Sequence, residues 1–172
     1  MLRKFSLVVF CGFWLAGCAE KNANVQQGQT GSNPKVLFET TQGNFTAELF
    51  PDVKVSTQNF LDLVSSGFYN GLTFHRYEPG FVIQGGDPTG TGMGGSGKTI
   101  PLEISAHKHD KGALGMARSQ DLNSASSQFY VCLDAAHALD GNYCVFGTIV
   151  DGMDNVLKLR RGDKMTKVTL LK

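Results

Sequence analysis

The sequence predicts a mainly β domain: a closed antiparallel β-barrel with helices over its open ends. Short runs of β-branched and aromatic residues recur along the chain between glycines, while only two segments have the apolar spacing of a helix. The chain has 172 residues, of which 41% are hydrophobic and 12 are phenylalanine. One domain can therefore bury a sizeable core, and a second domain is not expected.

The first expected elements are a β-hairpin and a helix. Residues 36–40 and 45–49 have β-like composition and flank a turn that contains Gly43. Ser56 is a suitable residue to cap a helix that follows the hairpin. Apolar residues then recur at helical spacing: Phe60, Leu63 and Val64.

The remaining chain adds short strands and one more helix. A short helix is expected at 154–159, where apolar residues cluster. The expected strands are apolar runs broken by glycine, at 72–77, 81–84, 113–117, 129–133, 144–150 and 168–171. These patterns alone indicate a β-rich globular domain and no specific function.

The N-terminus has the features of an export signal. Two basic residues precede an apolar stretch over 5–16, which is shorter than the roughly 20 residues that a membrane-spanning helix needs. Leu15-Ala16-Gly17-Cys18 resembles the lipobox of bacterial lipoproteins, in which the cysteine is acylated and becomes the mature N-terminus. We therefore expect residues 1–17 to be a lipoprotein signal peptide and Cys18 to carry lipid. An ordinary cleaved signal with an incidental cysteine is the alternative.

Residues 18–34 are expected to form a flexible tether, because almost none of them is apolar. The folded domain is then expected at 35–172, in the bacterial cell envelope, anchored to a membrane and facing the periplasm or the exterior. Removing residues 1–17 takes away two basic residues and no acidic one, so 14 basic and 15 acidic residues remain. With charges so nearly balanced, the sequence shows no excess of basic residues that would bind nucleic acid. We also expect the protein to be a monomer.

A glycine-rich segment at 92–99 matches the Walker A expression GxxxxGK[ST], which makes a P-loop nucleotide-binding protein one alternative. That motif requires a helix that starts at its Lys-Thr end and presents N–H groups to phosphate. Here Pro101 follows two residues after Thr99, and the next apolar residues alternate as in a strand. We expect a surface loop instead.

Four sequence blocks carry a family resemblance. Residues 74–87 read FHRYEPGFVIQGGD, and the blocks GALGMAR (112–118), NSASSQFY (123–130) and LDGNYCVFG (139–147) follow in order. Together they closely resemble the cyclophilin family of peptidyl-prolyl cis–trans isomerases. The resemblance implies an eight-stranded antiparallel barrel capped by two α-helices, with a substrate groove on its outer surface. It also implies isomerase activity without a cofactor or a metal.

The resemblance assigns roles to ten residues. Arg76 matches the family's catalytic arginine, whose planar charged guanidinium suits donation to the nitrogen of a twisted prolyl amide. Phe81 and Gln84 complete the implied catalytic set, by gripping the proline ring and by contacting the substrate backbone. The implied substrate-binding residues are Val82, Ala117, Arg118, Gln128, Tyr130, Leu139 and Tyr143.

Four positions depart from the common family pattern. Many members have Trp where this chain has Ala138, and in those members the Trp contacts the cyclic peptide cyclosporin. Tyr143, Tyr130 and Val82 stand where His, Phe and Met are common. These differences bear on substrate and inhibitor preference rather than on the chemistry. The expected substrates are proline-containing segments of exported proteins during folding, and a peptide-binding chaperone module with little turnover is the alternative.

The other chemistry-bearing residues give weaker signals. His107-Lys108-His109-Asp110 offers two imidazoles and a carboxylate, but catalytic zinc usually takes three well-placed ligands, and we expect no metal. If Tyr130 faces the groove, strand alternation turns Cys132 outward as well. Cys144 shares a face with core-like Phe146, so the two cysteines are expected on opposite faces, which disfavours a disulfide.

Overall fold

The structure is a computed structural model that describes residues 32–172; the expected signal peptide, Cys18 and the tether as far as residue 31 lie outside the described residues. Asn33 already contacts the sheet, because its side-chain amide donates to Glu48 Oε1 at 2.9 Å. Within residues 32–172, no helix is long and apolar enough to cross a membrane.

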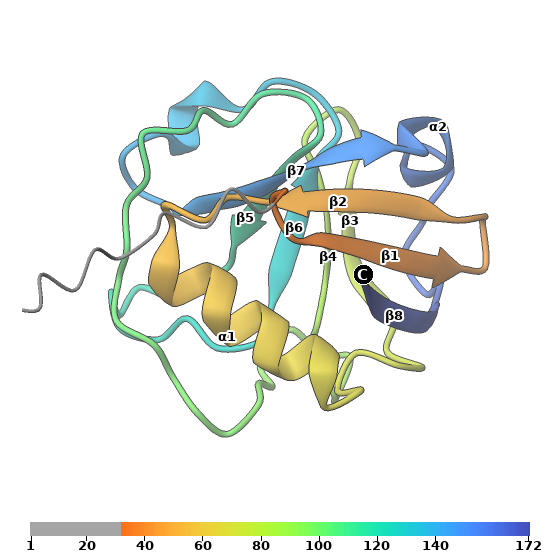
Figure 1. The fold of residues 1–172 in the computed structure, drawn as a ribbon, viewed down its shortest axis with the longest axis horizontal. Coiled ribbons are helices and arrows are strands. Elements are labelled where there is room, and N and C mark those ends of the chain that lie inside the picture. The colour runs from red at the N-terminus through yellow and green to blue at the C-terminus, as the bar shows by residue number, and fades with distance from the viewer. Residues whose placement is uncertain (1–31) are drawn as a thin grey trace, which may run out of the picture. The chain divides into compact units, whose positions relative to one another are not determined.

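The described chain contains eight strands, two α-helices and one short 3₁₀ helix. Figure 1 shows how the strands and the two α-helices are arranged. All eight expected strands and both expected helices are present. The elements are β1 (Lys35–Thr40), β2 (Phe45–Leu49), α1 (Lys54–Ser65), β3 (Phe74–Glu78), β4 (Val82–Gly85), β5 (Ala113–Met116), β6 (Phe129–Cys132), η1 (His137–Leu139), β7 (Val145–Asp151), α2 (Met153–Val156) and β8 (Met165–Leu171).

The strands form one antiparallel sheet in the order β3-β4-β6-β5-β7-β2-β1-β8, curled into an open half-barrel. The prediction of a closed barrel is therefore wrong. An isolated bridge between Thr73 and Lys164 joins the two edges, together with a few backbone hydrogen bonds such as those from Phe74 N–H to the Asp163 carbonyl at 2.8 Å and from Met165 N–H to the Leu72 carbonyl at 2.9 Å. Beyond it, antiparallel pairing would set residues 159–163 against β3 and residues 66–72 against β8. Both segments form turns and irregular backbone rather than strands, so no ladder closes the seam.

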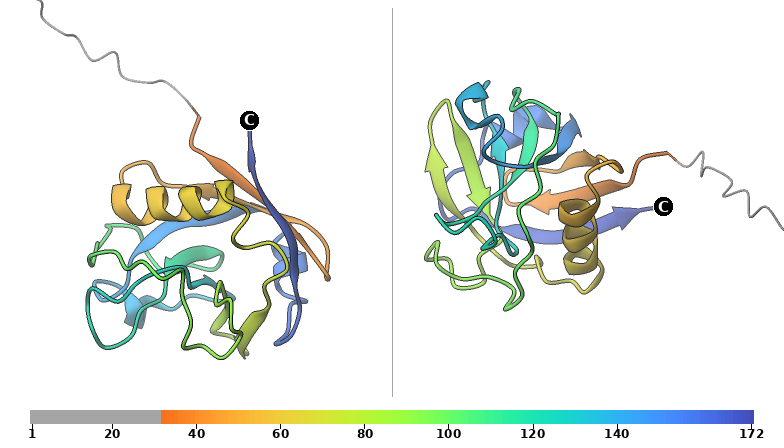
Figure 2. Two further views of the ribbon diagram at one scale, coloured as in Figure 1. Left: turned by 90° about the horizontal axis from the view of Figure 1, so that it is seen from below. Right: turned by 90° about the vertical axis from the view of Figure 1, so that its left-hand side faces the viewer.

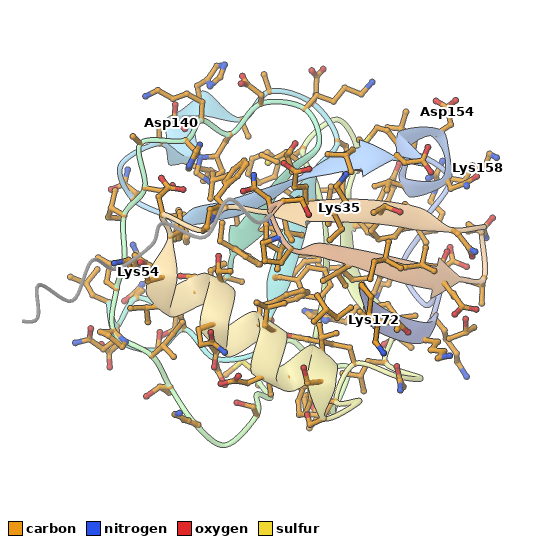
Figure 3. All side chains as sticks on the ribbon, viewed as in Figure 1. Lys35, Lys54, Asp140, Asp154, Lys158 and Lys172 are labelled. Carbon is orange, nitrogen blue, oxygen red and sulfur yellow. The ribbon has the colours of Figure 1, made fainter. Side chains whose placement is uncertain are left out.

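The core is aromatic and lies inside the curled sheet. Phe38 of β1 stacks on Phe45 of β2 with ring centroids 4.5 Å apart. Phe60 of α1 is fully buried and reaches Phe129 of β6 edge-on at 5.4 Å and Phe146 of β7 at 5.2 Å. These contacts hold α1 against the sheet, and α2 lies at the opposite end of it (Figures 1 and 2). Charged side chains such as Lys54 and Lys158 point away from this core (Figure 3).

Helix α1 is capped from a distance. We predicted Ser56 as its cap, which is wrong: the helix starts at Lys54, and Val53 at its N-cap makes no side-chain hydrogen bond. The carboxylate of Glu103 instead accepts the backbone N–H groups of Val55 at 3.1 Å and Ser56 at 2.8 Å. A helix start leaves N–H groups without partners inside the helix, and a remote carboxylate satisfies two of them here.

A second apolar cluster covers part of the outer face of the sheet. Tyr130 and Cys132 belong to this outer cluster, whereas Cys144 and Phe146 belong to the core, as strand alternation predicted. Both cysteines are free thiols. Burial raises the pKa of Cys132 to about 12 and that of Cys144 to about 11, so both stay protonated at neutral pH.

Candidate active site

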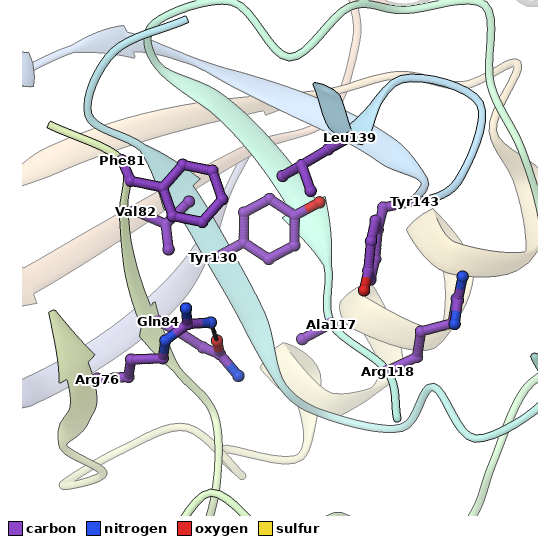
Figure 4. A pocket seen from close by; sticks show the side chains of 9 residues that line it. All are labelled: Arg76, Phe81, Val82, Gln84, Ala117, Arg118, Tyr130, Leu139 and Tyr143. Carbon is purple, nitrogen blue, oxygen red and sulfur yellow. Dashed lines mark hydrogen bonds between the residues drawn. The ribbon is translucent and has the colours of Figure 1, made fainter. Parts of the chain in front are cut away.

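Nine of the ten predicted site residues line one groove of about 240 Å³ on the outer face of the half-barrel (Figure 4). They come from three strands, from η1 and from the turns beside them. The lining residues are Arg76, Phe81, Val82, Gln84, Ala117, Arg118, Tyr130, Leu139 and Tyr143.

A straight row of cross-strand neighbours sets the geometry of the groove. Arg76 of β3 pairs with Gln84 of β4, Gln84 pairs with Tyr130 of β6, and Tyr130 pairs with Gly115 of β5. Directly paired residues of antiparallel strands place their side chains on the same face of the sheet. The register alone therefore brings the arginine, the glutamine and the tyrosine side by side.

The polar end of the groove is a chain of hydrogen bonds. Arg76 is half-exposed, and its Nη1 donates to Gln84 Oε1 at 3.2 Å (Figure 4). Gln84 Nε2 donates to Gln128 Oε1 at 2.8 Å. Gln128 Nε2 in turn donates to the carbonyls of Gly92 at 2.9 Å and Gly94 at 2.8 Å. This chain fixes the orientation of the Gln84 amide. Arg76 Nε donates to Glu78 Oε1 at 3.5 Å, and the remaining Nη N–H groups of Arg76 are available at the mouth of the groove.

The apolar end of the groove is made of aromatic and aliphatic side chains. Phe81, Val82 and Leu139 surround the ring of Tyr130 in Figure 4. Tyr143 meets that ring edge-on, with centroids 6.4 Å apart. The guanidinium of Arg118 lies 4.6 Å from the centre of the Tyr143 ring, and a cation at this distance is attracted to the ring face. Arg118 therefore helps to hold the Tyr143 ring in place at this end of the groove.

Gln128 is the one predicted site residue that does not line the groove. It lies in an adjoining depression of about 430 Å³, which shares Gln84, Ala117 and Arg118 with the groove. The side chain of Gln128 donates no bond into the groove itself: its amide accepts from Gln84 Nε2, and its backbone carbonyl accepts the N–H of Ala117 at 3.0 Å. The structure therefore places it behind the polar end, as a support of Gln84.

A buried carboxylate organises the glycine-rich segment that Gln128 holds. Asp87 is 1% exposed and accepts the N–H groups of Thr89 at 2.7 Å and Gly92 at 2.6 Å. Burial raises the pKa of Asp87, but these hydrogen bonds outweigh burial and hold the pKa well below its ordinary value. Asp87 therefore stays charged and fixes the loop whose carbonyls receive Gln128.

Residues 92–99 are a loop without a helix behind them. No helix starts at Lys98 or Thr99, and Ile100 instead forms a bridge with Ala125. The phosphate cradle of a P-loop depends on such a helix, so the nucleotide-binding alternative loses its structural basis.

The histidines of the 107–110 segment have separate partners. His107 contacts Asp52 at 3.1 Å and stacks on Phe50. His109 lies between Tyr130 and Asp140. In the part of the chain that the structure describes, no three histidine, cysteine or carboxylate side chains converge to hold a metal ion.

Sequence reasoning missed two residues of the groove's support, Gly115 and Asp140. It considered His109 only as a metal ligand, although this side chain is fully buried behind the groove. The available signal was the hydroxyl of Tyr130, because a buried phenol needs a hydrogen-bond partner. The sequence could not show which residue supplies it.

An arginine and a glutamine beside an apolar groove, on the outer face of a curled eight-stranded antiparallel sheet, define a cyclophilin-like domain. Residues 35–172 match the family described as "Cyclophilin type peptidyl-prolyl cis-trans isomerase/CLD". The chain belongs to this family.

Relatives in sequence and structure agree with this assignment. A peptidyl-prolyl cis-trans isomerase from Synechococcus elongatus is 40% identical over 140 residues, which is 80% of this chain and 96% of that protein. Peptidyl-prolyl isomerase CWC27 from Cryptococcus neoformans is 42% identical over 80% of this chain, but the match spans only 29% of that relative. A crystal structure of a Cryptosporidium parvum cyclophilin-type isomerase in the presence of the dipeptide Ala-Pro has a TM-score of 0.74 and 32% identity, covering 80% of this chain and 99% of that one.

Proposed function

We propose that this protein is a peptidyl-prolyl cis–trans isomerase that binds the proline ring in the apolar end of the groove and acts on the X–Pro bond with Arg76. The observation that carries the proposal is the row of paired residues, which sets a half-exposed guanidinium beside an apolar pocket. The Ala-Pro dipeptide named with the Cryptosporidium parvum structure supports a proline-containing ligand.

The reaction needs no covalent step. Rotation about an X–Pro bond takes tens to hundreds of seconds unaided, because amide resonance must be broken. In the twisted state the prolyl nitrogen becomes pyramidal and gains a free lone pair, which Arg76 can bind through a charge-assisted hydrogen bond. Such a bond contributes about 1.5–3 kcal/mol, or roughly one to two powers of ten in rate. No cofactor or metal takes part in this mechanism.

The apolar groove supplies the other half of the mechanism. A ring held by Phe81, Val82 and Leu139 stays still while the residue before proline rotates, so the bound geometry removes part of the entropy of reaching the twisted state. Gln84, whose amide Gln128 orients, faces the substrate backbone. The arginine and the pocket thus act on opposite sides of the same bond.

We further propose that the substrates are proline-containing segments of exported proteins, and that a lipid on Cys18 holds a monomeric domain at the outer side of a bacterial membrane. The lipobox-like sequence at 15–18 supports this proposal. Because Asn33 already contacts the sheet, the tether is the 14 residues from Ala19 to Ser32, which would reach about 45 Å if fully extended and would give the groove access to chains near the membrane.

The isomerase proposal is tested by the relaxation of a short X–Pro peptide from cis to trans. The unmodified protein should accelerate relaxation, and Arg76→Ala should lose at least a factor of ten with little change in melting temperature, because this exposed side chain contributes little to packing. Arg161→Ala is the matched control, since Arg161 is an exposed arginine outside the groove. Peptide binding without acceleration would favour a peptide-binding chaperone instead.

A further inference from the structure

The hydroxyl of Tyr130 lies against a fully buried histidine. His109 Nε2 is 2.8 Å from the Tyr130 hydroxyl, and His109 Nδ1 is 2.8 Å from Asp140 Oδ1. The imidazole is 0% exposed, and the rings of His109 and Tyr130 are almost parallel, with 15° between their planes. A tyrosine of the groove is thus joined through a buried imidazole to a carboxylate.

The direction of these hydrogen bonds follows from the chemistry of the partners. His109 hydrogen bonds lower the pKa of Asp140 below its ordinary value, so Asp140 is a carboxylate and can only accept. The tautomer of His109 that satisfies both contacts carries its proton on Nδ1, facing Asp140, and leaves Nε2 as an acceptor. Burial raises the pKa of Tyr130 well above its ordinary value, so the hydroxyl keeps its proton and donates it to Nε2.

His109 also holds one wall of the groove. Its backbone N–H donates to Asp140 Oδ1 at 3.0 Å, and its carbonyl accepts the N–H of Ala136 at 2.7 Å. Ala136 and Asp140 flank η1, which carries the groove residue Leu139. One buried residue therefore connects the ring of Tyr130 with the segment that presents Leu139.

We propose that His109 is a positioning residue of the isomerase site: it acts through the Tyr130 hydroxyl to hold the ring that receives the proline, and it keeps that ring in register with Leu139. The inference rests on the proposed function. His109 touches neither the reacting bond nor the groove surface, since it does not line the groove. Its effect must therefore appear in substrate binding.

Tyr130→Phe tests the link, because it removes the hydroxyl and keeps the ring. A lost hydrogen bond should raise KM for an X–Pro peptide about two- to tenfold while kcat stays within about twofold of the unmodified protein. A role in stability alone would instead lower the active fraction, and with it the apparent kcat, without changing KM. An unchanged KM overturns the proposal.

Tyr69→Phe is the matched control. The Tyr69 hydroxyl is also buried and donates to the Ser127 carbonyl at 3.0 Å, but Tyr69 belongs to the core and does not line the groove. The two substitutions should lower the melting temperature by similar amounts, and only Tyr130→Phe should raise KM. A comparable rise in KM for Tyr69→Phe would show that any lost buried hydroxyl has this effect.

His109→Leu, alone and combined with Tyr130→Phe, shows whether His109 acts through the hydroxyl. If it does, the double variant should have the KM of His109→Leu within about twofold, because the hydroxyl has already lost its partner. Effects on KM that multiply would overturn the proposal. If His109→Leu does not fold, the KM of Tyr130→Phe decides alone.

The proposed function can fail separately. An unmodified protein that does not accelerate peptide relaxation refutes the isomerase proposal. The dissociation constant of the same peptide, measured by titration, then replaces KM, and Tyr130→Phe should raise it by the same factor. Equal dissociation constants would refute the positioning role of His109.

Discussion

Gly115 of β5 lies directly opposite Tyr130 of β6, and the tyrosine ring fills the space that a side chain at position 115 would occupy. A Cβ at this position would overlap the ring and hydroxyl of Tyr130. The missing side chain of one strand thus makes room for the groove residue of the next strand.

Gly115→Ala should therefore displace the Tyr130 ring. Gly115 does not have a positive φ, so the alanine backbone is not strained and the effect comes from overlap alone. We expect a loss of about 1–3 kcal/mol in stability and a raised KM for X–Pro peptides, measured by thermal unfolding and by peptide relaxation. If KM stayed normal, the ring could shift without consequence for substrate binding.

Glu103→Ala should destabilise the start of α1. It removes the acceptor of two helix N–H groups, and the loss of a helix cap costs about 1 kcal/mol, seen as a lower melting temperature. Glu103→Gln keeps one acceptor oxygen and should lose less. Equal melting temperatures for all three proteins would show that water replaces the carboxylate at no cost.

His75 should make the fold sensitive to acid. Within residues 32–172 neither ring nitrogen has a hydrogen-bond partner, and burial lowers the pKa of His75 despite the nearby Asp87 carboxylate. Because the pKa of His75 is lower in the folded state, the unfolded chain binds this proton at a higher pH than the folded protein does. The contribution of His75 to the free energy of unfolding is therefore fully present above about pH 6.5 and decreases as the pH falls below that value. His75→Gln should flatten the melting temperature between about pH 6.5 and 5, and an unchanged slope would assign the sensitivity to other groups.

Cys18→Ser should release the protein from the membrane or block its processing. Durable anchoring takes two or more lipid chains, and serine cannot carry the thioether-linked lipid of a lipoprotein. Fractionation of cells that express either form measures the outcome. Equal processing and equal membrane retention would rule out lipidation at this position.

Ala138 should make the protein weakly sensitive to cyclosporin. Ala138 is exposed in η1 and offers neither the indole N–H nor the broad ring that a Trp provides in many relatives. The lost hydrogen bond and aromatic contact should weaken binding by roughly one to two powers of ten. Ala138→Trp should tighten inhibition without a comparable gain in turnover, and tight inhibition of the unmodified protein would contradict this view.

The sequence located the strands because their signal is local: β-branched and aromatic runs end at glycines, and all eight expected runs are strands. Features that depend on distant residues were not predictable. The prediction of a closed barrel was wrong because residues 66–72 and 159–163 form turns, whereas a closed barrel needs paired strands there. The prediction of Ser56 as the cap of α1 was wrong because the capping carboxylate belongs to Glu103, which is distant in the sequence.

The groove shows the same division. The family blocks brought nine predicted residues to one surface, since cross-strand register follows from the fold. They did not reveal that Tyr130 reaches His109, because this contact depends on the unusual hydroxyl and on how the 107–110 segment packs behind β6. Departures from a family pattern are therefore where side-chain geometry adds most to the sequence.

The open seam gives the two sides of the groove unequal mechanical support. Arg76 stands on β3, an edge strand whose ladder runs only to β4, whereas the strand of Tyr130 is bonded on both flanks. An edge can shift slightly without disturbing the rest of a sheet, while an interior strand moves only with its neighbours. The guanidinium of Arg76 thus lies on the edge strand, which can shift more easily, and the ring of Tyr130 lies on an interior strand, which is held more firmly. This arrangement suits an X–Pro bond whose proline ring is held still while the residue before it rotates.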